Sequence, residues 1–181
     1  MMKELSLHLL DVARNSVTAG AGHIELTVEE DDLRVCRMVI KDDGCGMSPE
    51  FLAQVTDPFS TTRTTRKVGL GLPLLRMTAE QTEGGLDVES QVGVGTTVTA
   101  RFHGSHIDCP PLGDLSGTVS LLIQGAPGVE WTWTHITPKG SYVLDTRQLR
   151  EILGPDVPLS EPAVALWIGE YLQEQEASIQ M

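Results

Sequence analysis

The sequence predicts an α/β protein, in which helical stretches and strands alternate along the chain. Apolar residues recur at helical spacing near the N-terminus, and runs of alternating apolar and polar residues follow, HIELTVE from His23 and LRVCRMVI from Leu33. Of the 181 residues, 40% are hydrophobic and 21% are charged, which is ordinary for a soluble globular protein. This length suits one domain, or one domain with a small appendage.

The first expected helix covers residues 4–19 and ends at the glycines of Ala19-Gly20-Ala21-Gly22. Its apolar faces come from Leu5, Leu9, Leu10, Val12, Ala13 and Val17. The two strand-like runs follow it, joined by an acidic turn at residues 29–32. Together these elements predict a helix that covers a pair of adjacent strands.

The middle of the chain predicts two more helices and a hairpin. Ser48-Pro49 is typical of a helix start, with a capping hydroxyl and a proline in the first turn, and this helix should end near Val55. Another helix should run from about Leu72 to the glycines at 84–85. Residues 86–90 and 96–102 should form a hairpin around Gly93-Val94-Gly95.

The C-terminal part begins with a Gly/Pro-rich segment, residues 103–114, that indicates a linker. We expect strands and then helices after it: strands at 119–124, 129–137 and 142–145, helices at 146–153 and 161–175. The predicted division is a domain at 1–103, a linker at 104–117 and a small α+β module at 118–181. Trp131 and Trp133 alternate on one strand and should lie in the core or on a partner surface, rather than form a stacking platform.

Charge and composition exclude several classes of protein. The net charge of −12 would repel nucleic acid, and no run of about 18 apolar residues exists to span a membrane. The N-terminus lacks the apolar core of a secretory signal, and three scattered cysteines form no disulfide framework. We therefore expect a cytoplasmic protein.

One loop departs from the acidic average. Residues 60–67 hold three cations, five hydroxyls and no acid. This composition fits binding of a small anion, but a solvated surface loop explains it as well.

Four Gly-x-Gly pairs punctuate the chain, at 20/22, 44/46, 69/71 and 93/95. None has the third glycine of the dinucleotide-binding pattern, and there is no GxxxxGK[ST] loop, which argues against a Rossmann site and a P-loop. The first pair is explained as a helix stop. Three further pairs at the edges of regular structure favour a backbone that approaches a ligand closely.

Polar residues form one stripe on the otherwise apolar first helix, since His8, Asp11, Asn15 and Thr18 recur at helical spacing. The stripe could simply be the wet side of the helix. A carboxylate and a carboxamide one turn apart are also good oxygen ligands for Mg²⁺ and its waters, and a carboxylate beside an ordered water can act as a general base.

Five short motifs then occur in order: Asp11-x-x-x-Asn15 with Ala19-Gly20-Ala21, Asp42-x-Gly44-x-Gly46, Asp57-Pro58-Phe59, Gly69-Leu70-Gly71-Leu72 and Gly93-x-Gly95-Thr96. Over about residues 5–102 the chain resembles the ATP-binding domain of the GHKL superfamily, which gyrases, heat-shock chaperones, histidine kinases and mismatch-repair ATPases share. The resemblance implies a two-layer α/β sandwich, a mixed sheet with helices on one face, followed here by the small α+β module.

The resemblance also implies ATP and Mg²⁺ as ligands. Asn15 would hold Mg²⁺, and Asp42 would accept a hydrogen bond from the adenine amino group. Gly44 would let the chain turn beneath the base, Gly46 and Met47 would line its pocket, and Thr96 would reach it through a hydroxyl or a water.

The same resemblance assigns the phosphates to the Gly69-Leu70-Gly71 motif, whose backbone N–H groups open a helix. The cationic loop corresponds to the mobile ATP lid of the family. One or more of Arg63, Arg66 and Lys67 would contact phosphate there.

Two features depart from the family pattern. The ATPase branches usually carry Glu where this chain has Asp11, so Asp11 is either a shorter general base or a Mg²⁺-water or structural residue. The few residues before the first helix leave no room for the phosphoacceptor-histidine hairpin of a histidine kinase, so we expect a stand-alone protein. His8 should have a local packing role or stand behind the site.

These expectations lead to two alternative functions. The first is Mg²⁺-dependent ATP binding with slow hydrolysis or phosphoryl transfer to a protein partner, as an ATPase or a kinase in signal transduction. The second is a non-catalytic module whose lid is ordered by ATP for partner binding through the lid or the C-terminal module. A zinc site at His103, His106 and Cys109 is a minor alternative. Oligomeric state stays open.

Overall fold

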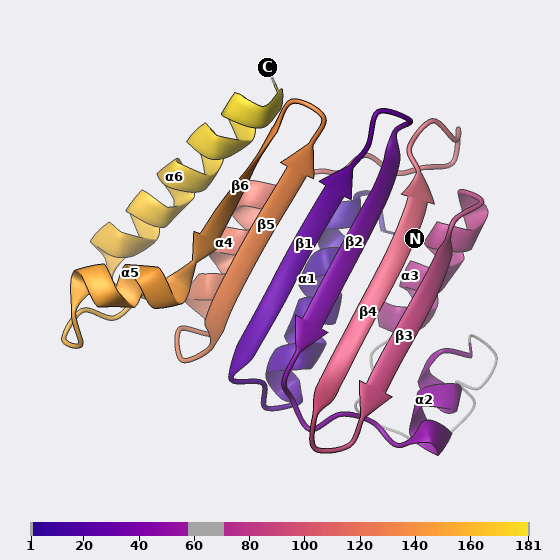
Figure 1. Ribbon diagram of the computed structural model, residues 1–181, viewed down its shortest axis with the longest axis horizontal. Coiled ribbons are helices and arrows are strands. Elements are labelled where there is room, and N and C mark those ends of the chain that lie inside the picture. Colours follow the sequence, from indigo (N-terminus) through magenta and orange to yellow (C-terminus); the bar gives the residue numbers. More distant parts are fainter. Residues whose placement is uncertain (1, 58–70, 181) are drawn as a thin grey trace.

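The computed structural model describes residues 2–57 and 71–180, which form one sheet with helices against it (Figure 1). In the described residues the sheet has six strands in the order β3-β4-β2-β1-β5-β6. The strands are β1 (His23–Glu30), β2 (Val35–Asp42), β3 (Gly85–Gln91), β4 (Gly95–His103), β5 (Glu130–Thr137) and β6 (Gly140–Asp145). All neighbouring pairs are antiparallel except β1 and β5, so the predicted mixed sheet is confirmed.

Six helices lie in the described ranges: α1 (Leu5–Thr18), α2 (Pro49–Val55), α3 (Gly71–Gln81), α4 (Leu115–Gly125), α5 (Thr146–Leu153) and α6 (Pro162–Gln180). In Figure 1, α1, α3 and α4 lie behind the sheet, and α6 runs beside its β6 edge. Helix α6 packs on α4 as well as on β6. The predicted two-layer α/β arrangement is therefore confirmed.

The core lies between the sheet and the helices because the strands alternate in polarity. Ile24, Leu26 and Val28 of β1 are buried towards α1, whereas the residues between them are only partly covered. The opposite face of the sheet has no helix over it in Figure 1 and carries ion pairs, Arg37 with Glu29 at 3.5 Å and Lys41 with Glu25 at 3.4 Å. One face of the sheet is therefore apolar and covered by helices, and the other carries charged side chains.

The C-terminal elements continue the same sheet. Strand β5 pairs in parallel with β1, so that Trp131 lies beside Ile24 and Trp133 beside Leu26. Both tryptophans are buried in the core, on one face of the strand, which agrees with the sequence-based expectation.

One expected strand is wrong, because residues 119–124 belong to helix α4. The Asp114 side chain accepts a hydrogen bond from the Gly117 backbone N–H at 2.8 Å and caps the helix. Leu115, Val119 and Leu122 then recur at helical spacing and are buried. The apolar run alone could not separate a buried helix from a buried strand, and the capping aspartate stood in the presumed linker.

The segment before α4 stabilises the N-terminus of α1. The backbone N–H groups of Leu5 and Ser6 donate to the carbonyls of Pro111 and Leu112 at 2.9 and 2.8 Å. These are amides that a helix cannot satisfy internally. Helix α1 is therefore held at its start by the chain that leads into the C-terminal elements.

The described helices include none that is long and apolar enough to cross a membrane.

Candidate functional site

A mainly apolar cavity of about 270 Å³ opens between α1, α2, the start of α3 and the ends of β2 and β4. Its lining is Val12, Asn15, Ser16, Thr18, Ala19, Asp42, Cys45, Gly46, Met47, Phe51, Val55, Leu72, Thr96 and Val98. Five sequence-predicted site residues lie in this lining: Asn15, Asp42, Gly46, Met47 and Thr96. The cavity combines apolar walls with a few polar groups, as small-molecule sites do.

Asp42 is the carboxylate of this cavity, placed there because β2 ends at it. Ser16 of α1 donates its hydroxyl to Oδ2 at 2.5 Å, and the Gly44 backbone N–H donates to Oδ1 at 2.9 Å. An ionised carboxylate offers about four acceptor positions, so these bonds orient the group and leave capacity for a ligand. The arrangement suits an N–H donor on a planar apolar ring.

Thr96 lies beside Asp42, because the two residues are paired across β4 and β2. The Ser90 hydroxyl is 2.7 Å from the Thr96 hydroxyl and accepts from the Met47 backbone N–H at 2.8 Å. Ser90 therefore joins the turn after β2 to the β3–β4 hairpin. Neither Ser90 nor Ser16 is among the site residues that the sequence predicts. The register of the predicted hairpin, which places Ser90 opposite Thr96, could have revealed the former.

Two glycines let the backbone close around this end of the cavity. Gly46 and Gly95 have positive φ angles of 69° and 141°. A Cβ at Gly46 would lie 2.0 Å from the Gln91 carbonyl oxygen, and one at Gly95 would lie 1.9 Å from that of Asp42. Any side chain would push the turn after β2 away from the hairpin, so these positions require glycine.

Asp43, which follows Asp42 in sequence, has a structural role instead. Its Oδ1 accepts the backbone N–H groups of His23 at 2.9 Å and Gly22 at 2.8 Å. The hydrogen bond from His23, with that from Gly22, holds the pKa of Asp43 below its usual value. Asp43 therefore ties the turn after β2 to the start of β1.

The polar stripe of α1 faces α3. A Cβ on Gly71, the first residue of α3, would lie 2.8 Å from Asp11 Oδ2 and 3.6 Å from the Asn15 side-chain nitrogen. Within the described residues neither Asp11 nor Asn15 has a side-chain hydrogen bond. The Asp11 carboxylate therefore stands beside the start of α3, with the Asn15 amide next to it. A carboxylate and a carboxamide form a donor set that fits a hydrated Mg²⁺ next to an anion.

His8, on the same stripe, is fully buried. Its Nε2 lies 3.0 Å from the Thr78 hydroxyl, which itself donates to the Leu74 carbonyl, so the ring donates from Nε2. Burial lowers the pKa of His8, and the nearby Asp11 carboxylate offsets this only in part. His8 is a neutral packing residue between α1 and α3, as the sequence analysis expected.

The other predicted phosphate contacts, Arg63, Arg66, Lys67, Gly69 and Leu70, lie outside the described residues. Gly44 is described and turns the chain directly after Asp42.

The side chains of His106 and Cys109, from the minor zinc alternative, make polar contacts with neighbouring residues in sequence. His106 Nδ1 accepts the Asp108 backbone N–H at 3.2 Å, and the Cys109 thiol lies 3.5 Å from the Pro110 carbonyl oxygen. Residues 2–57 and 71–180 contain no group of three or more His, Cys, Asp or Glu side chains arranged to hold a metal.

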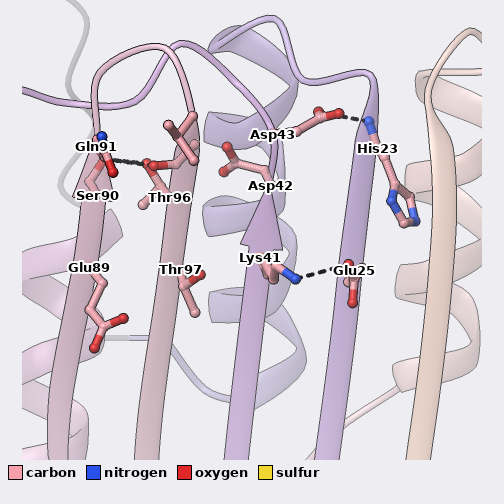
Figure 2. Close-up of a pocket in the computed structure, with 12 residues that line it drawn as sticks. His23, Glu25, Lys41, Asp42, Asp43, Glu89, Ser90, Gln91, Thr96 and Thr97 are labelled. Carbon is pink, nitrogen blue, oxygen red and sulfur yellow. Dashed lines mark hydrogen bonds and ion pairs between the residues drawn. The ribbon is translucent and has the colours of Figure 1, made fainter.

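A second cleft, of about 460 Å³, lies at the same end of the sheet on the helix-free face (Figure 2). Glu25, Glu89 and Asp43 line it, and its one lysine, Lys41, is paired with Glu25. Such a surface repels a polyphosphate. Asp42 lines this cleft as well, but its carboxylate is bonded to Ser16 on α1 and so faces the helix layer. The helix-side cavity is therefore the better nucleotide site.

Comparison with known proteins agrees with this geometry. The profile of the family described as histidine kinase-, DNA gyrase B- and HSP90-like ATPases matches residues 2–106. Sensor protein SrrB of Staphylococcus aureus is 36% identical over 106 residues, which are 56% of this chain and 18% of that protein. The chain thus matches less than a fifth of the length of this curated relative.

Two solved structures share the fold. The N-terminal domain of a DNA repair protein superposes with a TM-score of 0.55 at 18% identity, over 80% of this chain and 53% of that one. The Aquifex aeolicus MutL ATPase domain, complexed with ADP, gives 0.51 at 15% identity, over 84% and 70% of the two chains.

Proposed function

The chain belongs to the family of histidine kinase-, DNA gyrase B- and HSP90-like ATPases, and we propose on this basis that it binds ATP with Mg²⁺. We further propose that it slowly hydrolyses the nucleotide or transfers its γ-phosphate to a protein partner. The observation that carries the proposal is Asp42, a carboxylate held by Ser16 and Gly44 at the wall of an apolar cavity.

Asp42 supports recognition of adenine in particular. The exocyclic amino group of adenine donates a hydrogen bond, whereas guanine has a carbonyl at that edge, which a carboxylate cannot satisfy. Met47, Val98 and Leu72 supply apolar surface for the base. Thr96, held by Ser90, adds a hydroxyl beside the carboxylate. ATP should therefore bind much more tightly than GTP.

The facing ends of α1 and α3 support a phosphate site. The N-terminus of a helix favours anions through its N–H groups and its dipole, and α3 directs this end towards Asp11 and Asn15. Asn15 would hold Mg²⁺ through its side-chain oxygen, and the metal would neutralise triphosphate charge. Asp11, close to Gly71, would polarise a water or the attacking group. Arg63, Arg66 and Lys67 remain proposed phosphate contacts.

A second candidate function is an ATP-gated interaction module without catalysis. Helix α1, which carries Asp11 and Asn15, packs against α4, and its first amides bond to Pro111 and Leu112. A shift of α1 on nucleotide binding would thus reach the C-terminal elements directly. This contact favours a module in which ATP changes a partner surface.

Labelled nucleotide separates the two functions. The protein is incubated with Mg²⁺ and γ-labelled ATP, and both free phosphate and label on protein are followed for wild type, Asp11→Asn and Asp87→Asn. Asp87 is an exposed carboxylate of β3 away from the cavity and serves as the matched control. Binding of ATP and GTP is measured in parallel by calorimetry.

Turnover that collapses in Asp11→Asn but persists in Asp87→Asn, with ATP binding retained in both, would support the enzyme. Tight ATP binding without turnover in any variant would reject the enzyme and support the gated module. Failure to bind ATP with Mg²⁺, or equal affinity for GTP, would contradict the proposal as a whole.

A further inference from the structure

An apolar groove lies at the far end of the molecule from the nucleotide site, between α5 and α6. It has a volume of about 340 Å³ and is lined by Leu149, Ile152, Leu153, Ala163, Val164 and Trp167. Ile152 is 81% exposed and Trp167 is 48% exposed, and Leu166 beside them is 64% exposed. Single apolar residues on a surface are ordinary, but a contiguous group around a groove is typical of an interaction site.

The groove is firmly built. Leu149, Leu153 and Val164 pack against the hydrophobic core, so its floor is continuous with the interior of the protein. The Trp167 ring stacks on Tyr171, with centroids 5.2 Å apart and planes 16° from parallel. A tryptophan fixed in this way loses little conformational entropy on binding and is a typical anchor of a protein interface.

Acidic residues continue from the groove along one face of α6. Ala163, Trp167, Glu170 and Glu174 recur at helical spacing and share one exposed face of α6. This face is therefore apolar in its first half and acidic in its second, over about 16 Å. Two more exposed acids lie near the groove in sequence. Glu151 directly precedes Ile152, and Glu161 lies two residues before Ala163.

Among the ion pairs of the described residues, none involves Glu151, Glu161, Glu170 or Glu174. The two arginines of α5 are already engaged, Arg147 with Asp145 at 2.7 Å and Arg150 with Glu130 at 2.8 Å. The groove thus presents apolar surface followed by unpaired negative charge.

We propose that the α5–α6 groove binds an amphipathic helix of a partner protein, with apolar residues that enter the groove and Lys or Arg residues that face Glu170 and Glu174. A helix in a groove between two helices is a common mode of peptide recognition, and unpaired acids select a basic partner. The proposal rests on the groove and its charges alone and holds whether or not ATP is hydrolysed.

The same charges disfavour two other occupants. A second copy of this chain would bring acids against acids, on a protein with a net charge of −12. An anionic membrane surface would be repelled by the acidic half of α6. Both occupants are nevertheless distinguished by the experiment.

Model peptides test the proposal on the full chain. The first probe is a fluorescent helical peptide of about four turns, with leucines along one face and lysines at one end. The second carries glutamates in place of the lysines. Anisotropy is measured at low and high salt for wild type, Trp167→Ala, Glu170→Gln/Glu174→Gln, and Leu33→Ala. Leu33 is an exposed leucine in the β1–β2 turn and is the matched control.

We expect the basic peptide to bind wild type and Leu33→Ala equally and Trp167→Ala at least tenfold more weakly. The double glutamine variant should bind about three- to tenfold more weakly and lose most of the salt dependence. Thermal unfolding of each variant confirms that it is folded.

Several results would overturn the proposal. They are no binding of the basic peptide, equal binding of the acidic peptide, or binding indifferent to Trp167→Ala. Sedimentation of the protein alone and flotation with phosphatidylserine vesicles test the other occupants. Self-association or vesicle binding that Trp167→Ala abolishes would assign the groove to a second copy or to a membrane instead.

Discussion

Two carboxylates on the helix side of the sheet, Asp42 and Glu176, show how differently this fold uses buried acids. Asp42 accepts two hydrogen bonds, from Ser16 and Gly44, at the wall of a cavity. Glu176 of α6 is buried, bonded to His135 at 2.8 Å and to the Tyr142 hydroxyl at 2.6 Å. It lines none of the cavities described above.

The surroundings of Glu176 are closed by further bonds. His135 Nε2 lies 3.2 Å from Glu30, and the Trp133 indole N–H donates to the Tyr142 hydroxyl at 2.8 Å. This network fastens α6 to β1, β5 and β6. A carboxylate whose neighbours satisfy it stabilises the fold, whereas one with spare acceptor capacity at a cavity is available to a ligand.

The largest effect should follow from removal of Glu176. Glu176→Ala leaves a buried histidine and a tyrosine hydroxyl without their main partner, which should lower the free energy of unfolding by about 3–5 kcal/mol. Urea denaturation measures the change. The exposed Glu174→Ala on the same helix should change it by less than about 0.5 kcal/mol. Equal losses of stability in Glu176→Ala and Glu174→Ala would contradict the structural role of Glu176. Weaker ATP binding in a folded Glu176→Ala would contradict its separation from the nucleotide site.

The converse is expected at Asp42. Asp42→Asn keeps one acceptor oxygen but loses the charge that would receive the adenine amino group, so ATP affinity should fall about 10- to 100-fold. The free energy of unfolding should change by about 1 kcal/mol or less. Calorimetry with ATP and urea denaturation give the two quantities.

Asp43→Asn is the control for this measurement, because its amide oxygen can still accept from Gly22 and His23. It should bind ATP as wild type does. A loss of affinity as large as that of Asp42→Asn would contradict the assignment of adenine recognition to Asp42.

The network around Glu176 should also make stability depend on pH. Burial lowers the pKa of His135, but hydrogen bonds to Glu176 and Glu30 outweigh burial and raise it from 6.5 to about 9. The folded state therefore holds the proton more tightly. Its stabilising contribution, on the order of 3 kcal/mol, is complete below about pH 6.5 and is lost as the pH rises to about 9.

Denaturation of wild type and His135→Gln at several pH values isolates this contribution, because all other titrating groups are common to both proteins. The difference in the free energy of unfolding should shrink as the pH rises from 6.5 to 9.5. A difference that stays constant across this range would show that the folded state does not favour the charged imidazole.

The smallest effect is expected at Ser16. Ser16→Ala removes a neutral donor from Asp42, which should weaken ATP binding about three- to tenfold, equivalent to about 0.7–1.4 kcal/mol. Ser141→Ala, at an exposed serine of β6, is the control and should bind normally. Unchanged affinity in Ser16→Ala would indicate that β2 alone orients the carboxylate.

The sequence carried the information for most local structure, because that structure depends on neighbours in the chain. The spacing of Leu5, Leu9 and Val12 predicted α1, and Ser48 with Pro49 predicted the start of α2. Alternation predicted β1 and β2. The same reasoning failed at α4, whose capping Asp114 stood in a segment interpreted as a linker.

The residues of the candidate site also differ in whether the sequence reveals them. Asp42 and Asn15 were found from short motifs, and the structure brings both into one cavity. Ser16 and Ser90 were missed because each acts on a residue distant in sequence, Asp42 and Met47. The Ser16 hydroxyl carries no local sign of such a partner, whereas the hairpin register indicates only that Ser90 lies opposite Thr96.

By itself, then, the sequence determined most of the helices and strands and the family of this protein, since periodicity, caps and motifs are properties of a continuous chain. Only the tertiary structure decided that β5 joins β1, that Glu176 is bonded to His135 while Asp42 faces a cavity, and that α5 and α6 form an apolar groove with exposed Ile152 and Trp167. These features depend on which distant residues meet when the core closes, and burial and pairing exist only after that closure.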